Sequence, residues 1–244
     1  METSEQILLA ASELFALRGY HKVTVASICR KVGINVASVS YHFGGKQNLY
    51  AEVWRHLYAE SQKVLQSIME GASSPEQRLF ALLRYKVSAA LSSPGKPHWF
   101  TRLSHYEVAD PSPLHNQLVR DYLMDVRERY VEVIKSFLGE DVDPVLLYQA
   151  LLFLHGPIAD LLRFRISLEI KSISDAGKCP FFEKMRVFND DPEKLLQRLY
   201  NYVLAGLRAL QGGEGGREVT LKGRGAGRDA GDPRRHTKVF FVLS

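Results

Sequence analysis

The residues with a recognisable chemistry lie between Thr24 and Lys46, in the stretch TVASICRKVGINVASVSYHFGGK. In its second half, Ala37, Ser38, Tyr41 and His42 fall on one side of an expected helix. Small polar side chains of this kind can approach base edges and phosphate oxygens closely. A face that only had to be soluble would more often carry Lys and Glu. The stretch therefore predicts a DNA-binding surface.

Two short helices joined by a tight turn are needed to position that surface. Thr24 is expected to cap the first helix, with Val23 and Ile28 at the spacing of a hydrophobic staple. Gly33 is expected to end this helix in the left-handed conformation, and Asn35 is expected to cap the second. The pattern predicts a helix-turn-helix unit.

The stretch resembles the helix-turn-helix of TetR-type transcriptional repressors. The matching residues are Thr24, Val32, Gly33, Ile34, Asn35, Ala37, Ser38, Val39, Tyr41, His42, Phe43, Lys46, Leu49 and Tyr50. Many members carry Tyr where this chain has Ser40, and that Tyr touches a phosphate. Ser40 and Tyr41 are both left as candidates for the corresponding contact here.

The resemblance implies a set of DNA contacts. Phosphate contacts are expected from Thr24, Tyr41, His42 and Lys46. Base contacts are expected from Val36, Ala37, Ser38 and Ser40. Two alternatives remain: the three-helix unit packs against a partner protein, or Tyr41 and His42 pack under the following helix. The spacing of Val36, Val39 and Phe43 also predicts a shared buried face.

The charge of the chain is concentrated at its two ends. The 244 residues carry a net charge of +5. Residues 1–50 hold five basic and three acidic residues, and residues 212–244 hold seven basic and four acidic residues. Residues 51–211 are therefore neutral overall. This distribution indicates a DNA-binding head on a body with another role, and it excludes a protein that coats nucleic acid along its whole length.

The apolar periodicity predicts an all-α fold in three parts. These are a helix-turn-helix DNA-binding domain (1–50), a helical ligand-binding and dimerisation domain (51–211) and a Gly/Arg-rich tail (212–244). A cap residue followed by Pro predicts the start of four helices in the body. The pairs are Ser74-Pro75, Ser112-Pro113, Asp143-Pro144 and Asp191-Pro192. Residues 171–190 are expected to form a loop with a short turn.

One apolar run, Val145 to Leu162, is long enough to raise the question of a membrane span. It is interrupted by His155, Pro157 and Asp160, so burial against both the core and a partner subunit is the favoured interpretation. Together with the amphipathic stretch from Pro192 to Leu210 it predicts a four-helix homodimer interface and no membrane association.

The neutral body predicts a pocket for an apolar or aromatic small molecule. Candidate lining residues are Trp99, Phe100, Tyr106, Tyr122 and His155. The alternative for each is ordinary core. No catalytic motif is present, which argues against an enzyme, and no cofactor is implied. A cluster of His98, His105, Glu107 and Asp110 matches no metal-ligand pattern, so no metal site is expected.

The body also resembles one branch of the TetR-type family, through RLSHYEVADPSPLHNQLVRDYL (102–123) and the helices that follow. That branch includes a regulator of bacterial sensitivity to cefoperazone and chloramphenicol. The resemblance implies a repressor that leaves a palindromic double-stranded DNA operator when a small effector binds, often controlling transport or detoxification. The alternative is a DNA-binding or adaptor protein without a small ligand.

Three further expectations concern location and the tail. The N-terminus, METSEQ, is acidic and unlike a secretory signal, so a cytoplasmic protein is expected. Cys29 is expected to be a buried apolar side chain and Cys179 a plain thiol in a loop. The tail is interpreted as disordered, with a frame artefact or a basic arm that adds nonspecific DNA affinity as alternatives.

Overall fold

The computed structural model describes residues 2–91, 96–172 and 191–211. Every regular element in these ranges is a helix, which confirms the all-α prediction. The helices are α1 Thr3–Lys22, α2 Val25–Val32, α3 Ala37–Phe43, α4 Lys46–Met69, α5 Pro75–Leu91, α6 Lys96–Ala109, α7 His115–Leu118, the π-helical turn η1 Val119–Leu123, α8 Met124–Leu138, α9 Pro144–Ser172 and α11 Pro192–Gln211. The predicted tail and Cys179 lie outside the described residues.

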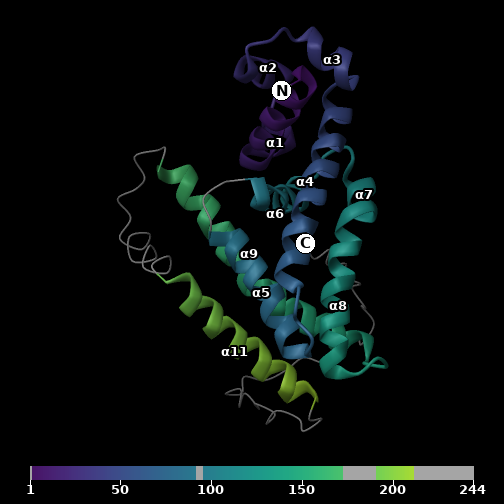
Figure 1. The fold of residues 1–244 in the computed structure, drawn as a ribbon, viewed down its shortest axis with the longest axis vertical. Helices are drawn as coiled ribbons and strands as arrows, with labels where there is room; N and C mark the ends of the chain where they lie inside the picture. The colour runs from purple at the N-terminus through teal and green to yellow at the C-terminus, as the bar shows by residue number, and fades with distance from the viewer. Residues whose placement is uncertain (1, 92–95, 173–190, 212–244) are drawn as a thin grey trace, which may run out of the picture.

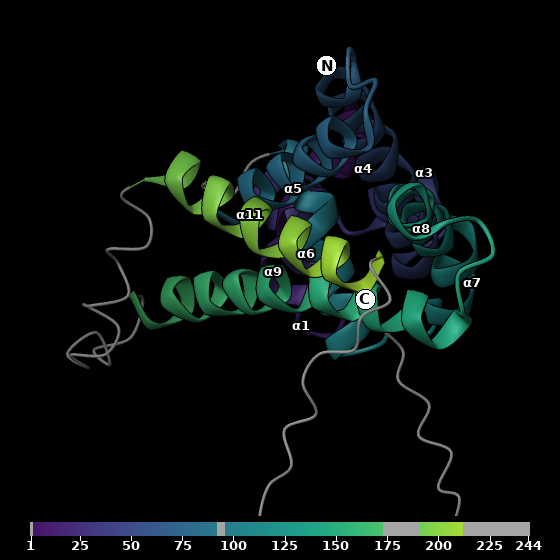
Figure 2. The ribbon, with the colours of Figure 1, turned by 90° about the horizontal axis from the view of Figure 1, so that it is seen from below.

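Helices α1 to α3 form a head at one end of the molecule, and α4 runs from this head down into the body (Figure 1). Helix α6 lies below α1, and the body is built from α5, α8, α9 and α11. Seen from below, α9 and α11 lie side by side along one edge (Figure 2). The head and the body therefore share α4 and α6 as connecting elements.

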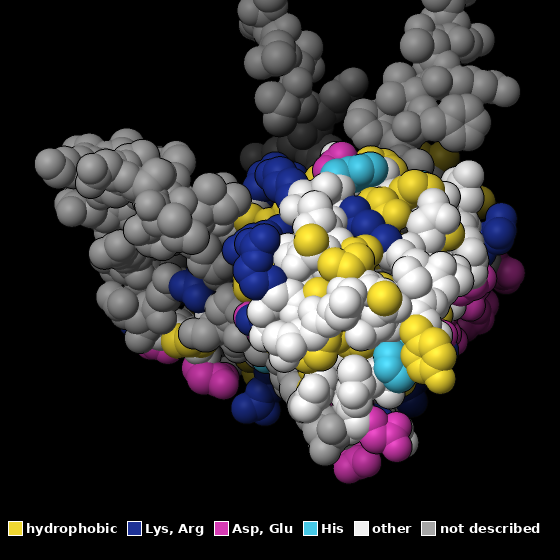
Figure 3. Space-filling model, turned by 90° about the horizontal axis from the view of Figure 1, so that it is seen from above, with side chains coloured by type: hydrophobic (Ala, Val, Ile, Leu, Met, Phe, Trp, Pro, Cys, Tyr) yellow, Lys and Arg dark blue, Asp and Glu magenta, His cyan; other side chains and the backbone are white. Residues whose placement is uncertain are grey.

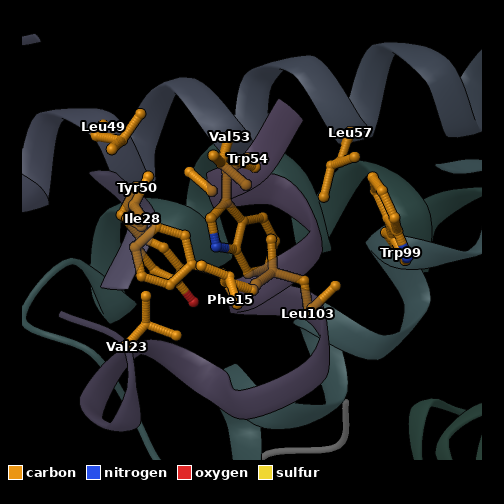
Figure 4. Close-up of a cluster of buried hydrophobic side chains, with 14 of the residues drawn as sticks. Phe15, Val23, Ile28, Leu49, Tyr50, Val53, Trp54, Leu57, Trp99 and Leu103 are labelled. Atoms are coloured by element: carbon orange, nitrogen blue, oxygen red, sulfur yellow. The ribbon is translucent and has the colours of Figure 1, made fainter. Parts of the chain in front are cut away.

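A single buried cluster joins the head to α6. Phe15 from α1, Tyr50 and Trp54 from α4 and Leu103 from α6 are all fully or almost fully buried within it (Figure 4). The rings of Phe15 and Tyr50 meet edge to face with centroids 4.8 Å apart. This cluster crosses the domain boundary predicted at residue 50, so the first turns of α4 belong to the core of the head.

The connection between α1 and α6 depends on a glycine. Gly19 interrupts α1 with φ 73° and ψ 173°. A Cβ atom at this position would lie 3.3 Å from the ring of Tyr106 on α6. Positive φ and the close ring together require glycine here.

Three of the four predicted cap residues stand directly at the start of a body helix. Asp143 Oδ1 accepts hydrogen bonds of 2.9 Å from two backbone N–H groups in the first turn of α9, and Asp191 Oδ1 accepts one of 2.9 Å at the start of α11. Ser74 forms a capping box with Gln77. Ser112 Oγ accepts a 3.2 Å hydrogen bond from the Leu114 N–H and its hydroxyl donates to buried Glu107, but the regular helix begins at His115 and not, as expected, at Pro113.

Candidate DNA interface and ligand cavity

The turn between α2 and α3 has the predicted geometry. Thr24 Oγ1 accepts a 3.1 Å hydrogen bond from the backbone N–H of Ser27, whose own hydroxyl oxygen accepts from the Thr24 N–H. Gly33 ends α2 in the left-handed conformation with φ 79°. Asn35 Oδ1 then accepts from the N–H of Ala37 at 2.9 Å. These contacts fix the angle between the two helices by local chemistry alone.

The outer face of α3 is open to solvent. Tyr41 is 86% exposed, and its ring meets that of exposed His42 edge to face with centroids 5.0 Å apart. Neither ring packs under α4. The expectation of a shared buried face was wrong for Val36, which is 48% exposed, whereas Val39 is fully buried. Val36 therefore lies on the surface expected to meet the bases.

The remaining predicted contacts surround this face. Ala37 and Ser40 are exposed, Ser38 is partly buried, and Thr24 is exposed at the start of α2. Lys46 opens α4 with its Nζ 4.0 Å from the ring centroid of Tyr20, and burial lowers the pKa of its ammonium group. Backbone N–H groups at a helix start favour an anion, so Lys46 and this terminus point to a phosphate.

The end of the head carries mainly small polar side chains and backbone, with Lys and Arg gathered along one side (Figure 3). Sequence reasoning missed exposed Arg30 in the last turn of α2 and exposed Gln47 in the first turn of α4. Lys31 is less available, because its Nζ lies 2.8 Å from Glu13 Oε1. The positive charge of Arg30 and the position of Gln47 at a helix start were the available signals.

The body contains a cavity of about 840 Å³ lined by α4, α5, α6, η1, α8 and α9. Of the five predicted lining residues, Phe100 and His155 line it. The other three belong to the head-to-α6 packing. Trp99 is buried there, Tyr122 stacks on Trp54 with centroids 5.8 Å apart, and the Tyr106 hydroxyl donates to the Leu17 carbonyl at 3.0 Å.

Apolar side chains make up most of the cavity wall, and several cationic groups interrupt it. Lys86, Arg127 and Arg129 contribute to the lining, together with His105 and His155. No Asp or Glu occurs among the described residues that line this cavity. The polar groups of the wall are thus basic or neutral.

Two of these groups have strongly altered proton affinities. Burial lowers the pKa of Lys86 to about 8, and its Nζ lies 4.9 Å from the ring centroid of Tyr130. Burial, and then the positive charges of Lys86 and Arg127, lower the pKa of His155 to about 3. At neutral pH the cavity therefore holds a charged ammonium group and an uncharged imidazole.

Lys86→Met is expected to raise the free energy of unfolding of the ligand-free protein at neutral pH by on the order of 2 kcal/mol. The pKa of Lys86 falls from 10.5 to about 8 on folding, so the unfolded chain binds more protons between these values. Wild-type stability should consequently rise with pH across that window, and the variant should lack this rise. Urea unfolding across the window tests this, with Lys63→Met, at an exposed lysine, as the control. Equal pH slopes in all three proteins would contradict it.

Within the described ranges, no group of three or more His, Cys, Asp or Glu side chains is placed to hold a metal ion. Cys29 is a buried free thiol whose pKa is raised by burial, as expected of a small apolar core residue. The chemistry offered by the described residues is therefore concentrated in the head and in the cavity.

Residues 7–53 match the family described as bacterial regulatory proteins, tetR family. The HTH-type transcriptional regulator BetI of Brucella canis is 30% identical over 106 residues, which are 43% of this chain and 54% of that protein. The chain thus matches about half the length of this curated relative. That relative is a transcriptional regulator of the HTH type.

Solved structures extend the likeness to the whole fold. The fatty acid degradation regulator FadR from Bacillus halodurans superposes with a TM-score of 0.55 at 18% identity, over 85% of this chain and 97% of its own. A transcriptional regulator from Saccharomonospora viridis in complex with choline superposes with a TM-score of 0.54 at 18% identity, over 82% of this chain and 95% of its own. Such likeness supports a shared head-and-body architecture. The N-terminal part of the chain, residues 7–53, with its helix-turn-helix, is therefore the part that is similar to the tetR family of bacterial regulatory proteins.

Proposed function

We propose that this protein is a cytoplasmic transcriptional repressor that binds a palindromic operator as a homodimer and is released by a small molecule held in the body. The observation that carries the proposal is the position of α6. One side of α6 packs against α1 of the head, and the other side lines the 840 Å³ cavity. A pocketless body would have favoured the adaptor alternative.

The DNA contacts of this proposal use the exposed face of α3. Tyr41, His42, Thr24 and Lys46 would position the head on phosphates, while the small side chains beside Ser38 would approach base edges. Two heads related by a two-fold axis would enter successive major grooves about 34 Å apart. In this proposal residues 1–50 form the DNA-binding domain. The hydrophobic core of that domain also includes side chains of α4 and α6.

The homodimer is supported by an exposed apolar surface on α9 and α11. Val145, Leu152 and Phe153 on α9 are 64%, 42% and 55% exposed, and Tyr202 on α11 is 64% exposed. Gly206 on α11 is also exposed, with no atom within 4 Å of an added Cβ, so a partner helix could approach its backbone closely. Symmetry-related copies of these two helices would cover the surface as a four-helix interface.

A membrane is the other medium that could cover this surface. The segment Pro144–Ile166 is long and apolar enough to cross a bilayer by length and composition, and 28% of its most apolar window is buried. However, its inward face carries His155 and lines a cavity containing Lys86, and its outward face carries exposed Asp160. The charged side chains of Asp160 and Arg163 on α9, and the ammonium group of Lys86 on α5 at the cavity, favour a partner subunit over lipid.

Helix α6 supplies the route by which the cavity would act on the head. Phe100 and His105 line the cavity. From the same helix, the Tyr106 hydroxyl donates to the Leu17 carbonyl at 3.0 Å, and buried Glu107 accepts a 2.7 Å hydrogen bond from the Tyr50 hydroxyl of α4. A ligand that displaces α6 would therefore shift α1 and α4 together and change the spacing of the two heads.

Tyr106→Phe is expected to weaken this coupling without emptying the cavity, because the removed hydroxyl bonds α1 and the residue does not line the cavity. The loss of a neutral hydrogen bond, worth about 1 kcal/mol, should reduce the effect of ligand on operator affinity roughly fivefold. The measurement is operator affinity with and without a saturating cavity ligand in both proteins. An unchanged ratio of the two affinities would show that coupling bypasses this contact.

The effector proposed from composition is apolar or aromatic, and the apolar cavity wall supports this class. The similar structure that holds choline binds a quaternary ammonium ion. In this chain no acidic residue lines the described cavity to pair with such a cation. The resemblance to TetR-type repressors leads us to propose transport or detoxification genes as the regulated set.

Release is tested by titrating apolar and aromatic compounds into a complex of the protein with its selected operator. Allosteric coupling of about 1–3 kcal/mol predicts that a cavity ligand lowers operator affinity roughly 5- to 150-fold. A cavity-filling variant, Ala159→Trp, should abolish this response while keeping DNA binding, because Ala159 lines the cavity far from α3. Compounds that occupy the cavity and leave DNA affinity unchanged would contradict the proposal.

A further inference from the structure

The polar part of the cavity wall is assembled from three helices. Lys86 comes from α5, Arg127 and Tyr130 from α8, and His155 from α9. Tyr130 lies at the centre of the group, with the Lys86 ammonium 4.9 Å from its ring centroid and the His155 ring centroid 4.6 Å away. Lys86 and Arg127 both act electrostatically on His155. These side chains therefore form one cationic site inside an apolar cavity.

No acidic side chain neutralises this cationic site. Arg129, the third cation of the wall, pairs with Asp125 at 3.3 Å. For Lys86 and Arg127 no ion pair with any described residue is found. Removing a charge from water without a counterion costs several kcal/mol, so proteins pair buried charges or neutralise them. Lys86 bears this cost, because burial lowers the pKa of its ammonium group, whereas Arg127 is half-buried. Because no acidic side chain pairs with these two cations, we expect the ligand to supply the negative charge.

Neutral groups near the site can complete the binding of an anion. His155 is uncharged at neutral pH and retains a ring N–H that can donate a hydrogen bond. Gln62 also lines the cavity, and its side-chain oxygen is buried without a hydrogen-bond partner. Rotation of this amide would present its NH₂ group to an acceptor. Both groups suit an oxygen-rich acid, whereas a hydrocarbon would leave the buried amide of Gln62 without a new partner.

We propose that the effector is an organic anion, in which a carboxylate or sulfonate group on an apolar or aromatic body binds Lys86 and Arg127. This inference rests on the proposed ligand cavity and narrows the chemical class that it accepts. The apolar wall would hold the body of the ligand, and the cationic site would select its charge. A cationic ligand of similar size would be excluded by repulsion.

Two fluorescent probes that differ by one acid group test the charge selection. 8-Anilinonaphthalene-1-sulfonate and N-phenyl-1-naphthylamine have the same aromatic body, and only the first carries a sulfonate. The intact protein is expected to bind the sulfonate at least about tenfold more tightly, which corresponds to 1.4 kcal/mol. Lys86→Met should remove this preference by weakening sulfonate binding alone, and Lys63→Met, at an exposed lysine on α4, should keep it.

The outcomes separate the inference from the proposed function. Equal or tighter binding of the neutral probe, lost in Ala159→Trp, would overturn the anion inference and leave an apolar ligand cavity. A sulfonate preference that persists in Lys86→Met would also overturn it, because the cationic site would not be its source. If Ala159→Trp, with an unchanged circular dichroism spectrum, affects neither probe, the cavity is not the ligand site. The proposed function would then fail together with the inference.

Discussion

Leu152→Glu combined with Phe153→Glu is expected to convert the protein into a monomer and to lower operator affinity more than about 100-fold. Both side chains are exposed apolar groups on α9. In the proposed homodimer they would be buried, and two glutamates in each subunit would meet their copies across the two-fold axis. A monomer would bind only one half-site of the operator and would lack the contacts that the second head makes with the other half-site. Sedimentation velocity and operator binding by fluorescence anisotropy measure the two effects.

The control for this variant carries the same charges elsewhere. Gln66 and Ser67 are adjacent and exposed on α4. Gln66→Glu with Ser67→Glu should leave both the dimer and the operator affinity intact. A wild-type protein that sediments as a monomer, or a charged α9 variant that keeps full operator affinity, would refute the proposed interface.

Tyr41→Ala is expected to reduce operator affinity on the order of 100-fold without affecting the fold. A hydrogen bond to a charged phosphate contributes about 1.5 kcal/mol, and the dimer would lose two of them. Tyr41 is 86% exposed, so its removal leaves the core unchanged. Tyr41→Phe separates the hydroxyl from the ring and should account for most of the loss. Operator titrations at several salt concentrations give the measurement.

The alternative assignment for the phosphate contact is Ser40, which is also exposed. If Tyr41→Ala binds the operator within twofold of wild type and Ser40→Ala does not, the contact belongs to Ser40. If neither substitution changes the affinity, the outer face of α3 is not the DNA surface.

The local elements were predictable because their signals lie within a few residues of each other. Gly33 has the left-handed conformation that ends α2, and Asn35 and Asp143 accept backbone hydrogen bonds at helix starts. Val36 was misplaced because helical spacing groups residues by side without saying which side meets the core. Ser112 accepts the Leu114 N–H as a cap would, but its hydroxyl is also bonded to Glu107, a buried partner that helix spacing did not predict, and the regular helix starts only at His115.

The cavity was only partly predictable because its wall combines residues far apart in the chain. The aromatic residues of the body were predicted to line the cavity. This holds for Phe100, but Trp99 packs in the core of the head. Adjacent residues on a helix point in different directions, and composition cannot separate them. The cationic site combines Lys86 and Arg127 from different helices, so no spacing in the sequence could predict it.

The central claim, sequence-specific DNA recognition by a dimeric head, is tested most directly by selection from genomic DNA. Purified protein would be mixed with a genomic fragment library at near-physiological salt, and the retained fragments would be sequenced. The account predicts enrichment of one near-palindromic site with half-sites about one helical turn apart. Binding that is weak, independent of sequence and lost as salt rises would contradict it.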